Sequence, residues 1–255
     1  MRLTKIGKRF IKKNRGLNAL FLLFLIYEMN LISVEVEWKL TKPFKIEFDH
    51  NPTSISGPNG YGKTTLLNLI YFSIAKKQIP KEYLNVVHYF KLETTDGFAE
   101  YKEGEFKSNI ESTEIYYINT FRDSYKIPTD KEYPSYFIDF LNLQDELFQF
   151  LIEGGTGKLI CKVVPTGTRL GFDKFSNGFK NLALIGSALG EIKDGGVLLI
   201  DDFERSMHLG IQLEFKKRLV DLVRSGQLIY TAHSPEVFVS WDHDVDLFEI
   251  TERNK

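Results

Sequence analysis

The fold of the chain is decided by one stretch of nine residues, Gly57-Pro58-Asn59-Gly60-Tyr61-Gly62-Lys63-Thr64-Thr65. A short run before it, Thr53 to Ile55, predicts a strand. After the lysine, apolar side chains recur at the spacing of a helix face, at Leu66, Leu67, Leu69, Ile70 and Phe72. The glycine-rich loop is therefore expected between a strand and a helix.

The spacing Gly57-x4-Gly62-Lys63-Thr64 suits a loop that holds phosphate. Backbone N–H groups that close onto a helix N-terminus attract a polyphosphate, and glycine permits the backbone angles needed. Lys63 is then placed for the β and γ phosphates of ATP, and the Thr64 hydroxyl for a magnesium ion. The alternative is a glycine-rich turn without a ligand. We expect six residues to bind the nucleotide: Asn59, Gly60, Gly62, Lys63, Thr64 and Thr65.

A second element is the apolar run Val197 to Ile200, which ends in Asp201 and Asp202. A buried strand needs no acids at its end in order to fold. We expect Asp201 to hold the magnesium ion together with Thr64, and Asp202 to orient or deprotonate an attacking water. The alternative is a strand followed by a solvated acidic turn.

The remaining pattern favours an α/β domain. A hairpin is expected over 32–48 and a β-rich elaboration over 76–114, with strands at 88–93 and 98–101. In the second half, strands are expected at 114–121, 158–164, 195–200, 228–232 and 246–251, and helices at 136–152, 182–189 and 209–224. Residues 234–236 are typical of a helix N-terminus. The strand–helix–strand order predicts a mostly parallel central sheet.

Four patches together resemble the ATP-binding-cassette (ABC) type of P-loop ATPase, in its RecF/SMC/OLD-like branch of AAA ATPases. They are residues 57–65, 175–180, 198–208 and 230–236, and their order matches from about residue 31 onward. The resemblance implies the head-domain fold of that branch, with a parallel central sheet and an antiparallel β subdomain. It also implies binding of ATP and Mg²⁺, and hydrolysis of ATP.

The resemblance assigns roles to three further residues. Ser176 and the backbone around Gly178 would meet the γ-phosphate that another subunit binds, so that ATP joins two heads. His233 would contact the γ-phosphate and the attacking water, which makes it a catalytic candidate beside Asp202. Without the resemblance, Ser176 to Gly178 reads as a turn and helix cap, and His233 as a structural histidine at a strand end.

The chain departs from the family pattern at two points. The position of the usual catalytic glutamate holds Asp202, whose side chain is one methylene shorter, so slow turnover is expected. Glu204 could substitute if the turn brings it inward; otherwise it is a surface acid. The glutamine that senses magnesium has no clear counterpart, and Asn119 is the nearest candidate, although a polar residue at a strand end is ordinary.

The N-terminal part of the chain differs in composition from the rest. Residues 1–28 contain seven basic residues and one acidic residue, so their net charge is +6. The basic residues lie before the apolar run 19–27. We divide the chain of 255 residues into an extension, 1–28, and a single ATPase domain, 29–255. The extension is read as a product of a start codon upstream of Met29, as a membrane or partner anchor, or as a packed helix. One cysteine, Cys161, excludes a disulfide framework and suits the cytoplasm.

Spacing separates the related function classes. The segment 203–208 lacks the pattern of transporter ATPases. The interval between Lys63 and Ser176 is too short for the long coiled-coil arm of an SMC-like protein. Too few residues follow His233 for the nuclease domain of an OLD-like protein. We therefore expect a stand-alone head that self-associates on ATP and controls a separate effector protein, in anti-phage defence or genome maintenance. Nucleic acid is a candidate partner, and a membrane is not expected. The alternatives are an ATP-binding switch with little hydrolysis and a membrane-associated subunit.

Overall fold

The computed structural model describes most of the chain after the N-terminal extension. The described residues are 30–39, 41–49, 51–111, 114–120, 133, 135–142, 146–154, 156–191, 196–222, 226–233 and 243–253. Residues 1–28 and the expected helix start at 234–236 lie outside them. The division into an extension and one domain therefore stays a prediction.

The central sheet has five strands in the order β13-β3-β12-β11-β7, and every neighbouring pair is parallel. Its strands are β3 (Thr53–Ser56), β7 (Ile115–Asn119), β11 (Val197–Asp201), β12 (Gln227–Thr231) and β13 (His243–Asp246). All residues of β3, β11 and β12 are buried. Continuous apolar runs are typical of parallel strands that are covered on both faces.

A second sheet of five strands is antiparallel, in the order β2-β1-β4-β5-β6. Its strands are β1 (Leu31–Trp38), β2 (Phe44–Glu47), β4 (Val87–Thr94), β5 (Phe98–Lys102) and β6 (Glu105–Ser108). In β1, Val34, Val36 and Trp38 are buried, whereas Glu35 and Glu37 between them are partly exposed. This alternation matches a sheet with one face on the core.

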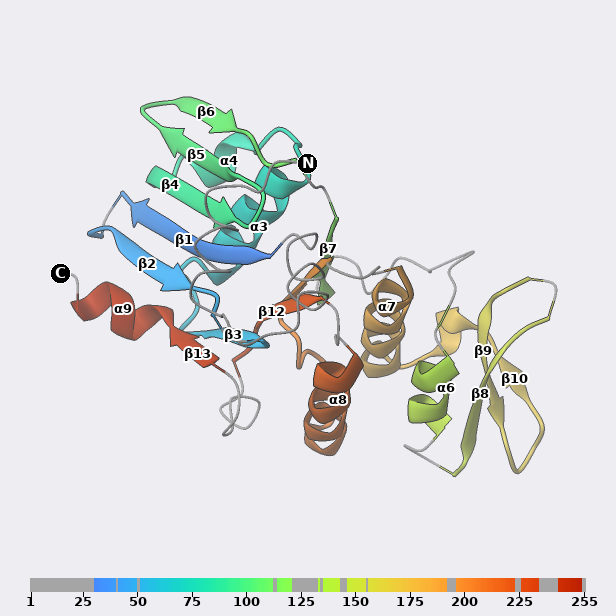
Figure 1. Ribbon diagram of the computed structural model, residues 1–255. Helices are drawn as coiled ribbons and strands as arrows, with labels where there is room; N and C mark the ends of the chain where they lie inside the picture. Colours follow the sequence, from blue (N-terminus) through green and yellow to red (C-terminus); the bar gives the residue numbers. More distant parts are fainter. Residues whose placement is uncertain are drawn as a thin grey trace, which may run out of the picture.

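The central sheet separates two apolar cores, because neighbouring side chains of a strand point to opposite faces. Val197 and Leu199 of β11 join the core that contains the antiparallel sheet and the helices α3 (Lys63–Ile74) and α4 (Lys81–Leu84). Leu198 and Ile200 join the other core, with α6 (Ser135–Asn142), α7 (Asn177–Glu191) and α8 (Leu209–Leu222). Figure 1 shows α3 beside the antiparallel sheet, and α7 and α8 on the other side of β11 and β12.

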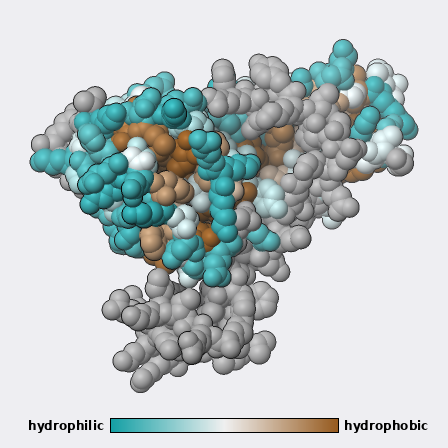
Figure 2. All heavy atoms as spheres, turned by 90° about the horizontal axis from the view of Figure 1, so that it is seen from above, coloured by the Kyte–Doolittle hydropathy of each residue, from teal (hydrophilic) through white to brown (hydrophobic). Residues whose placement is uncertain are grey.

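A third, small sheet projects beyond α6 and α7 (Figure 1). It has the order β10-β9-β8 and consists of β8 (Phe148–Ile152), β9 (Leu159–Val163) and β10 (Arg169–Leu170). The short 3-10 helix η1 (Phe172–Lys174) leads from it into α7. Phe150 of β8 contacts Phe175 and Phe179, so this sheet packs directly on the start of α7. Seen from above, the same lobe extends to the right of a larger body whose apolar surface is framed by hydrophilic side chains (Figure 2).

The helix expected over 136–152 is wrong in its second half. Helix α6 ends at Asn142, and residues 148–152 form strand β8. The Asn142 amide accepts a hydrogen bond from the backbone N–H of Phe150 and donates one to its carbonyl. The apolar run at 148–152 fits both periods, and pairing with β9 decides in favour of the strand.

The last strand, expected over 246–251, is also wrong. Strand β13 ends at Asp246, and helix α9 (Leu247–Arg253) follows at once. The Asp246 carboxylate accepts hydrogen bonds from the backbone N–H groups of Phe248, at 2.8 Å, and Glu249, at 3.4 Å. This N-cap starts the helix where the apolar pattern alone predicts a strand.

The fold class is confirmed. The chain combines a parallel central sheet, with the glycine-rich loop between β3 and α3, and an antiparallel β subdomain. Strands expected at 88–93, 98–101, 114–121 and 158–164 appear as β4, β5, β7 and β9. Within the described ranges, no helix is long and apolar enough to cross a membrane.

Candidate functional site

The glycine-rich loop forms an anion-binding cradle at the start of α3. Gly57, Gly60 and Gly62 have φ angles of 124°, 87° and 89°, in the left-handed region that favours glycine. A side chain on Gly62 would also collide with Trp38, because its Cβ would lie 2.9 Å from the indole. No side chain caps the start of α3, so its first backbone N–H groups are available to phosphate oxygens.

Lys63 lies across the mouth of this loop. Its ammonium donates hydrogen bonds to the carbonyls of Gly57, at 2.6 Å, and Pro58, at 3.2 Å, and lies 3.4 Å from Nδ1 of His233. Burial lowers the pKa of Lys63, whereas the nearby carboxylates of Asp202 and Asp201 oppose that shift. The lysine is thus a buried cation whose present partners are neutral carbonyls, which a phosphate group could replace with negative charge.

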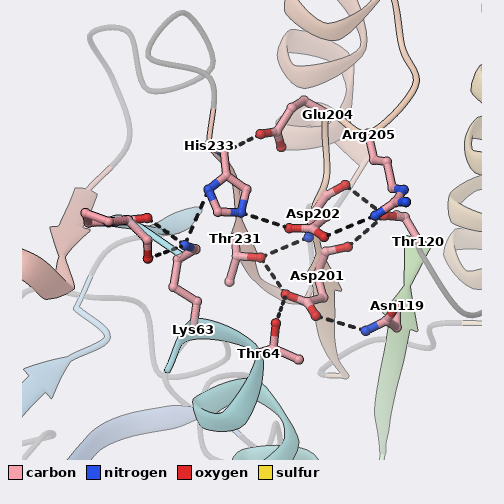
Figure 3. A network of polar contacts seen from close by, with 12 residues as sticks. Lys63, Thr64, Asn119, Thr120, Asp201, Asp202, Glu204, Arg205, Thr231 and His233 are labelled. Carbon is pink, nitrogen blue, oxygen red and sulfur yellow. Dashed lines mark hydrogen bonds and ion pairs between the residues drawn. The ribbon is translucent and has the colours of Figure 1, made fainter. Parts of the chain in front are cut away.

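Asp201 ends β11 and lies beside Thr64 and Thr231 (Figure 3). Its Oδ1 accepts hydrogen bonds from the hydroxyls of Thr64, at 3.2 Å, and Thr231, at 2.7 Å. Its Oδ2 accepts one from the Asn119 amide at 2.9 Å. Burial raises the pKa of Asp201, and the hydrogen bonds from Thr231 and Thr64 oppose that shift.

Thr64 and Asp201 fit a magnesium ion by their chemistry. Magnesium prefers oxygen ligands, and proteins usually supply only one or two of them besides water and phosphate oxygens. Among the described residues, no three His, Cys, Asp or Glu side chains are grouped as a metal site. The hydroxyl and carboxylate of this pair, next to the phosphate loop, are therefore suited to an ion that arrives with a nucleotide.

Asp202 lies next to the loop, between two basic side chains. Its Oδ1 lies 3.3 Å from Nε2 of His233, and its Oδ2 lies 3.8 Å from the Arg205 guanidinium. Its φ angle is 55°, a conformation that non-glycine residues rarely adopt, although Asp is among the more tolerant. The imidazole of His233 thus bridges Asp202 and Lys63 (Figure 3).

These groups surround one cavity of about 250 Å³. The cavity is lined by eight of the sequence-predicted residues, Asn59, Gly60, Gly62, Lys63, Thr64, Thr65, Asp202 and His233. Asp201 is nearly inaccessible, with 2% of its surface exposed, and reaches this group through Thr64. The structure therefore brings together the predicted phosphate, magnesium and water-activating residues.

Ser176 and Gly178 are not among the residues that line this cavity. The hydroxyl of Ser176, exposed just before α7, accepts a hydrogen bond from the backbone N–H of Phe179 at 3.4 Å. A Cβ on Gly178 would lie 2.5 Å from the carbonyl oxygen of Ser206, so only glycine fits against the turn after Asp202. Within one chain, these residues act as a helix cap and a close-packing point.

Glu204 is neither at the cavity, as a substitute for the catalytic acid would be, nor a surface acid without a structural role. Its carboxylate accepts a hydrogen bond from the backbone N–H of His233, so it holds the chain that carries the histidine (Figure 3). Asp202, by contrast, faces the imidazole of the same histidine. Glu204 is therefore a support for His233 in the geometry seen here, and Asp202 is the carboxylate at the cavity.

Sequence reasoning missed Thr231, Thr120 and Tyr117, and it left Asn119 out of the site. Thr231 contacts Asp201 and Asp202, Thr120 contacts the carbonyls of both, and Tyr117 lies 3.4 Å from Oδ2 of Asp201. The pairing of β7 with β11 would have identified Asn119, because it is the register partner of Asp201 across this parallel pair. Polar residues at the ends of adjacent parallel strands meet at one sheet edge.

A larger pocket, of about 670 Å³, adjoins the phosphate loop. Gly60, Gly62 and Thr65 line both this pocket and the smaller cavity. The other lining residues are Trp38, Lys39, Thr41, Tyr61, Asn85, Val86 and Thr251. Within the described part of the chain, the indole N–H of Trp38 and the hydroxyl of Thr41 are buried without a hydrogen-bond partner.

Comparison with known protein families gives one match. A sequence profile of the family described as "AAA domain, putative AbiEii toxin, Type IV TA system" matches residues 77–240. The matched range contains Ser176, Asp201, Asp202 and His233, and it begins after the phosphate loop. No curated protein sequence matches the chain.

Solved structures share the fold at low sequence identity. The SMC head domain from Thermotoga maritima has 18% identity and a TM-score of 0.57, over 82% of this chain and 90% of that one. An SmcHead bound to the C-winged helix domain of ScpA has 12% identity and a TM-score of 0.63, with coverage of 82% and 90%. An Smc head with an extended coiled coil, bound to the C-terminal domain of ScpA derived from Pyrococcus furiosus, has 11% identity and a TM-score of 0.58, with coverage of 82% and 91%. This likeness confirms the predicted head-domain fold.

Proposed function

Because this chain belongs to the AAA domain family whose description links it to the AbiEii toxin and type IV toxin–antitoxin systems, we propose that it hydrolyses ATP and controls a separate effector. One observation carries the proposal. Lys63, Thr64, Asp202 and His233 line a single cavity at the uncapped start of α3. These are the groups needed to hold a triphosphate and to direct a water at it.

The residues divide the work as follows. The loop N–H groups and Lys63 bind the β and γ phosphates, and Lys63 exchanges its bonds to the Gly57 and Pro58 carbonyls for phosphate oxygens. Thr64 and Asp201 would hold a magnesium ion, which would neutralise part of the phosphate charge. His233, whose Nδ1 lies 3.4 Å from the Lys63 ammonium, is placed beside the same phosphate.

Asp202 orients a water for attack on the γ-phosphorus. As the new P–O bond forms, the bond to the bridging oxygen breaks and ADP leaves with that electron pair. The proton of the water passes to the Asp202 carboxylate, or through it to the released phosphate. His233, 3.3 Å from Asp202, keeps the carboxylate directed at the cavity. The shorter aspartate is consistent with slow turnover.

The larger pocket is the proposed place of the nucleoside. It opens from the same glycines that line the phosphate cavity, and Trp38 and Tyr61 offer aromatic surface to a base. This arrangement supports ATP as a whole, and not merely free phosphate, as the ligand.

Association of two heads is the proposed role of Ser176 and Gly178. Ser176 is exposed at the start of α7, where its hydroxyl and the helix N-terminus suit the γ-phosphate of a second copy. The solved heads bound to ScpA domains support an effector protein as a further partner. The family description supports a role in defence, with nucleic acid as another candidate partner.

Residues 29–255 are proposed as the working unit, with 1–28 as a separable extension. The basic and apolar composition of 1–28 leaves a membrane-associated subunit as an alternative. A chain that starts at Met29 decides between them. Unchanged ATPase activity and unchanged fractionation support the separable extension, whereas loss from the membrane fraction supports the anchor.

A second candidate function is an ATP-binding switch with little hydrolysis. The observation in its favour is the Asp202 carboxylate itself, which is shorter than a glutamate and lies 3.8 Å from the Arg205 guanidinium. In this case ATP would be bound and would hold two heads together without being consumed.

Phosphate release from MgATP tests the proposed function. We expect turnover by the wild type and a loss of about 100-fold or more in Lys63→Ala, since the loop loses its phosphate-binding cation. Lys77→Ala is a matched control, because Lys77 is an exposed lysine that contacts Tyr71 at the far end of α3. Equal turnover in Lys63→Ala and the wild type would contradict the proposal.

A further inference from the structure

The backbone of Asp202 is held in its unusual conformation by two buried threonines. The Asp202 N–H donates a hydrogen bond of 2.9 Å to the hydroxyl oxygen of Thr231 on β12. The hydroxyl of Thr120, just after β7, lies 2.9 Å from the carbonyl oxygen of Asp202 and 3.0 Å from that of Asp201, so its one proton is shared between these two acceptors. Both threonines have 0% exposed surface. The turn is therefore tied on one side to β12 and on the other to β7 (Figure 3).

Thr231 connects two functions with one hydroxyl group. A hydroxyl has one proton to donate and lone pairs that accept. Here the proton goes to Oδ1 of Asp201, at 2.7 Å, and a lone pair takes the N–H of Asp202. The backbone of Thr231 adds a third tie, since its carbonyl accepts the N–H of Phe203 at 3.0 Å. Asp201 and Asp202 are thus fixed relative to one another through a single side chain.

The direction of the Asp202 carboxylate depends on this backbone. An aspartate has one side-chain torsion fewer than a glutamate, so it cannot reach the cavity by extending its side chain. With φ at 55°, its carboxylate lies 3.3 Å from Nε2 of His233 and lines the phosphate cavity. If the peptide before Asp202 turned to an ordinary conformation, the same short side chain would leave from the backbone in another direction.

We propose that Thr231 is a positioning residue that aims Asp202 at the water site by holding its N–H and thereby its left-handed backbone. The proposal rests on the hydrolysis of ATP proposed above. It assigns Thr231 a role through Asp202 that is separate from its hydrogen bond to the magnesium carboxylate of Asp201. Thr120 supports the same turn from the opposite side.

The test compares Thr231→Val with Thr231→Ser in the full chain. Valine keeps the shape of threonine but leaves the Asp202 N–H without a partner, whereas serine keeps the hydroxyl. We expect kcat for phosphate release to fall about 100-fold in Thr231→Val at saturating Mg²⁺, as for a displaced catalytic group, with KM for ATP little changed. Thr231→Ser is expected to retain most of the wild-type kcat.

The chain offers a matched control at Thr94. Its hydroxyl also donates to a carboxylate, that of Asp96 at 2.7 Å, and accepts a backbone N–H, that of Gly97 at 3.0 Å. Thr94 is equally buried and lies in β4 of the antiparallel sheet. Thr94→Val should lower the free energy of unfolding about as much as Thr231→Val and leave kcat unchanged. It therefore separates a general loss of stability from a change in the orientation of Asp202.

Three kinetic results would overturn the proposal: a wild-type kcat in Thr231→Val, a kcat in Thr231→Ser as low as in the valine variant, or a loss in Thr231→Val that appears at low Mg²⁺ and disappears at saturating Mg²⁺. The last would show that the hydroxyl acts through Asp201 alone. A crystal structure of Thr231→Val decides the matter without turnover. We expect Asp202 to leave the left-handed region, and an unchanged Asp202 would contradict the proposal. If the wild type releases no phosphate, the proposed function fails, and the crystal structure still tests this inference.

Discussion

The phosphate loop and the segment around Ser176 are two halves of one proposed nucleotide site, and they differ in how far a single chain completes them. At the loop, Lys63, Thr64, Asp201, Asp202 and His233 contact one another directly. At the other half, the Ser176 hydroxyl is exposed, and within the described residues it accepts a hydrogen bond from the start of its own helix. Under the proposed function, the groups that act on ATP lie within one chain, and Ser176 acts on the ATP of a second copy.

The largest expected effect is on ATP-dependent association, through a change at Ser176. Ser176→Asp keeps a good helix cap but places a negative charge where the γ-phosphate of a second head would lie. We expect ATP-dependent association to be lost, with thermal stability and ATP binding by the monomer retained. Mass in solution with and without ATP measures this, and Ser176→Asn is the neutral cap control. Normal ATP-dependent association of Ser176→Asp would contradict the comparison, because Ser176 would then not meet the γ-phosphate of a second copy.

Gly178 links the two halves and gives a smaller effect. A Cβ there would meet the carbonyl of Ser206, in the turn that follows Asp202, at 2.5 Å. Alanine normally favours a helix over glycine, so a loss of stability in Gly178→Ala would report this contact. We expect about 1–3 kcal/mol of destabilisation, which lowers Tm by about 2–4 °C per kcal/mol. Gly154→Ala, where a Cβ meets nothing within 4 Å, is the control. An unchanged Tm in Gly178→Ala would mean that the two segments are not tightly packed.

The smallest expected effect is a dependence of stability and turnover on pH, caused by Asp201 next to the phosphate loop. Burial raises the pKa of Asp201 above its ordinary value of 3.8. Between 3.8 and the raised pKa, the native chain binds a proton that the unfolded chain has lost, so the free energy of unfolding falls as pH rises through this window. Turnover should rise over the same window, because the magnesium ion needs the carboxylate.

Urea unfolding of the wild type relative to Asp201→Asn, measured across acidic pH, isolates the contribution of this carboxyl group. The difference in unfolding free energy should decrease with rising pH while wild-type phosphate release increases. A stability difference that rises with pH would show that hydrogen bonds from Thr231, Thr64 and Asn119 outweigh burial at Asp201.

The two halves also differ in how well the sequence predicted them. Lys63 and Thr64 belong to one contiguous motif, and Asp201 follows an apolar strand, so local pattern is enough to find them. Thr231 and Asn119 reach Asp201 from neighbouring strands, and only the strand order shows that they meet it. The position of Glu204 depends on the turn after β11, which local sequence does not specify.

Most of the fold was predictable for the same reason. Strands with a clear apolar run, such as Val197 to Ile200, were placed correctly. The segment 148–152 was predicted as helix because its short apolar run fits either period, and its pairing with β9 across the chain decides the outcome. The start of α9 depends on one carboxylate cap at Asp246, which outweighs the pattern around it.

The most direct test of the central claim is phosphate release by Asp202→Asn, measured together with its affinity for MgATP. Asparagine tolerates the left-handed backbone, so the change is confined to the charge of the side chain. We predict that ATP still binds and that phosphate release falls about 100-fold or more, as for the loss of a general base. Wild-type turnover in Asp202→Asn would contradict the assignment of Asp202 as the residue that activates water.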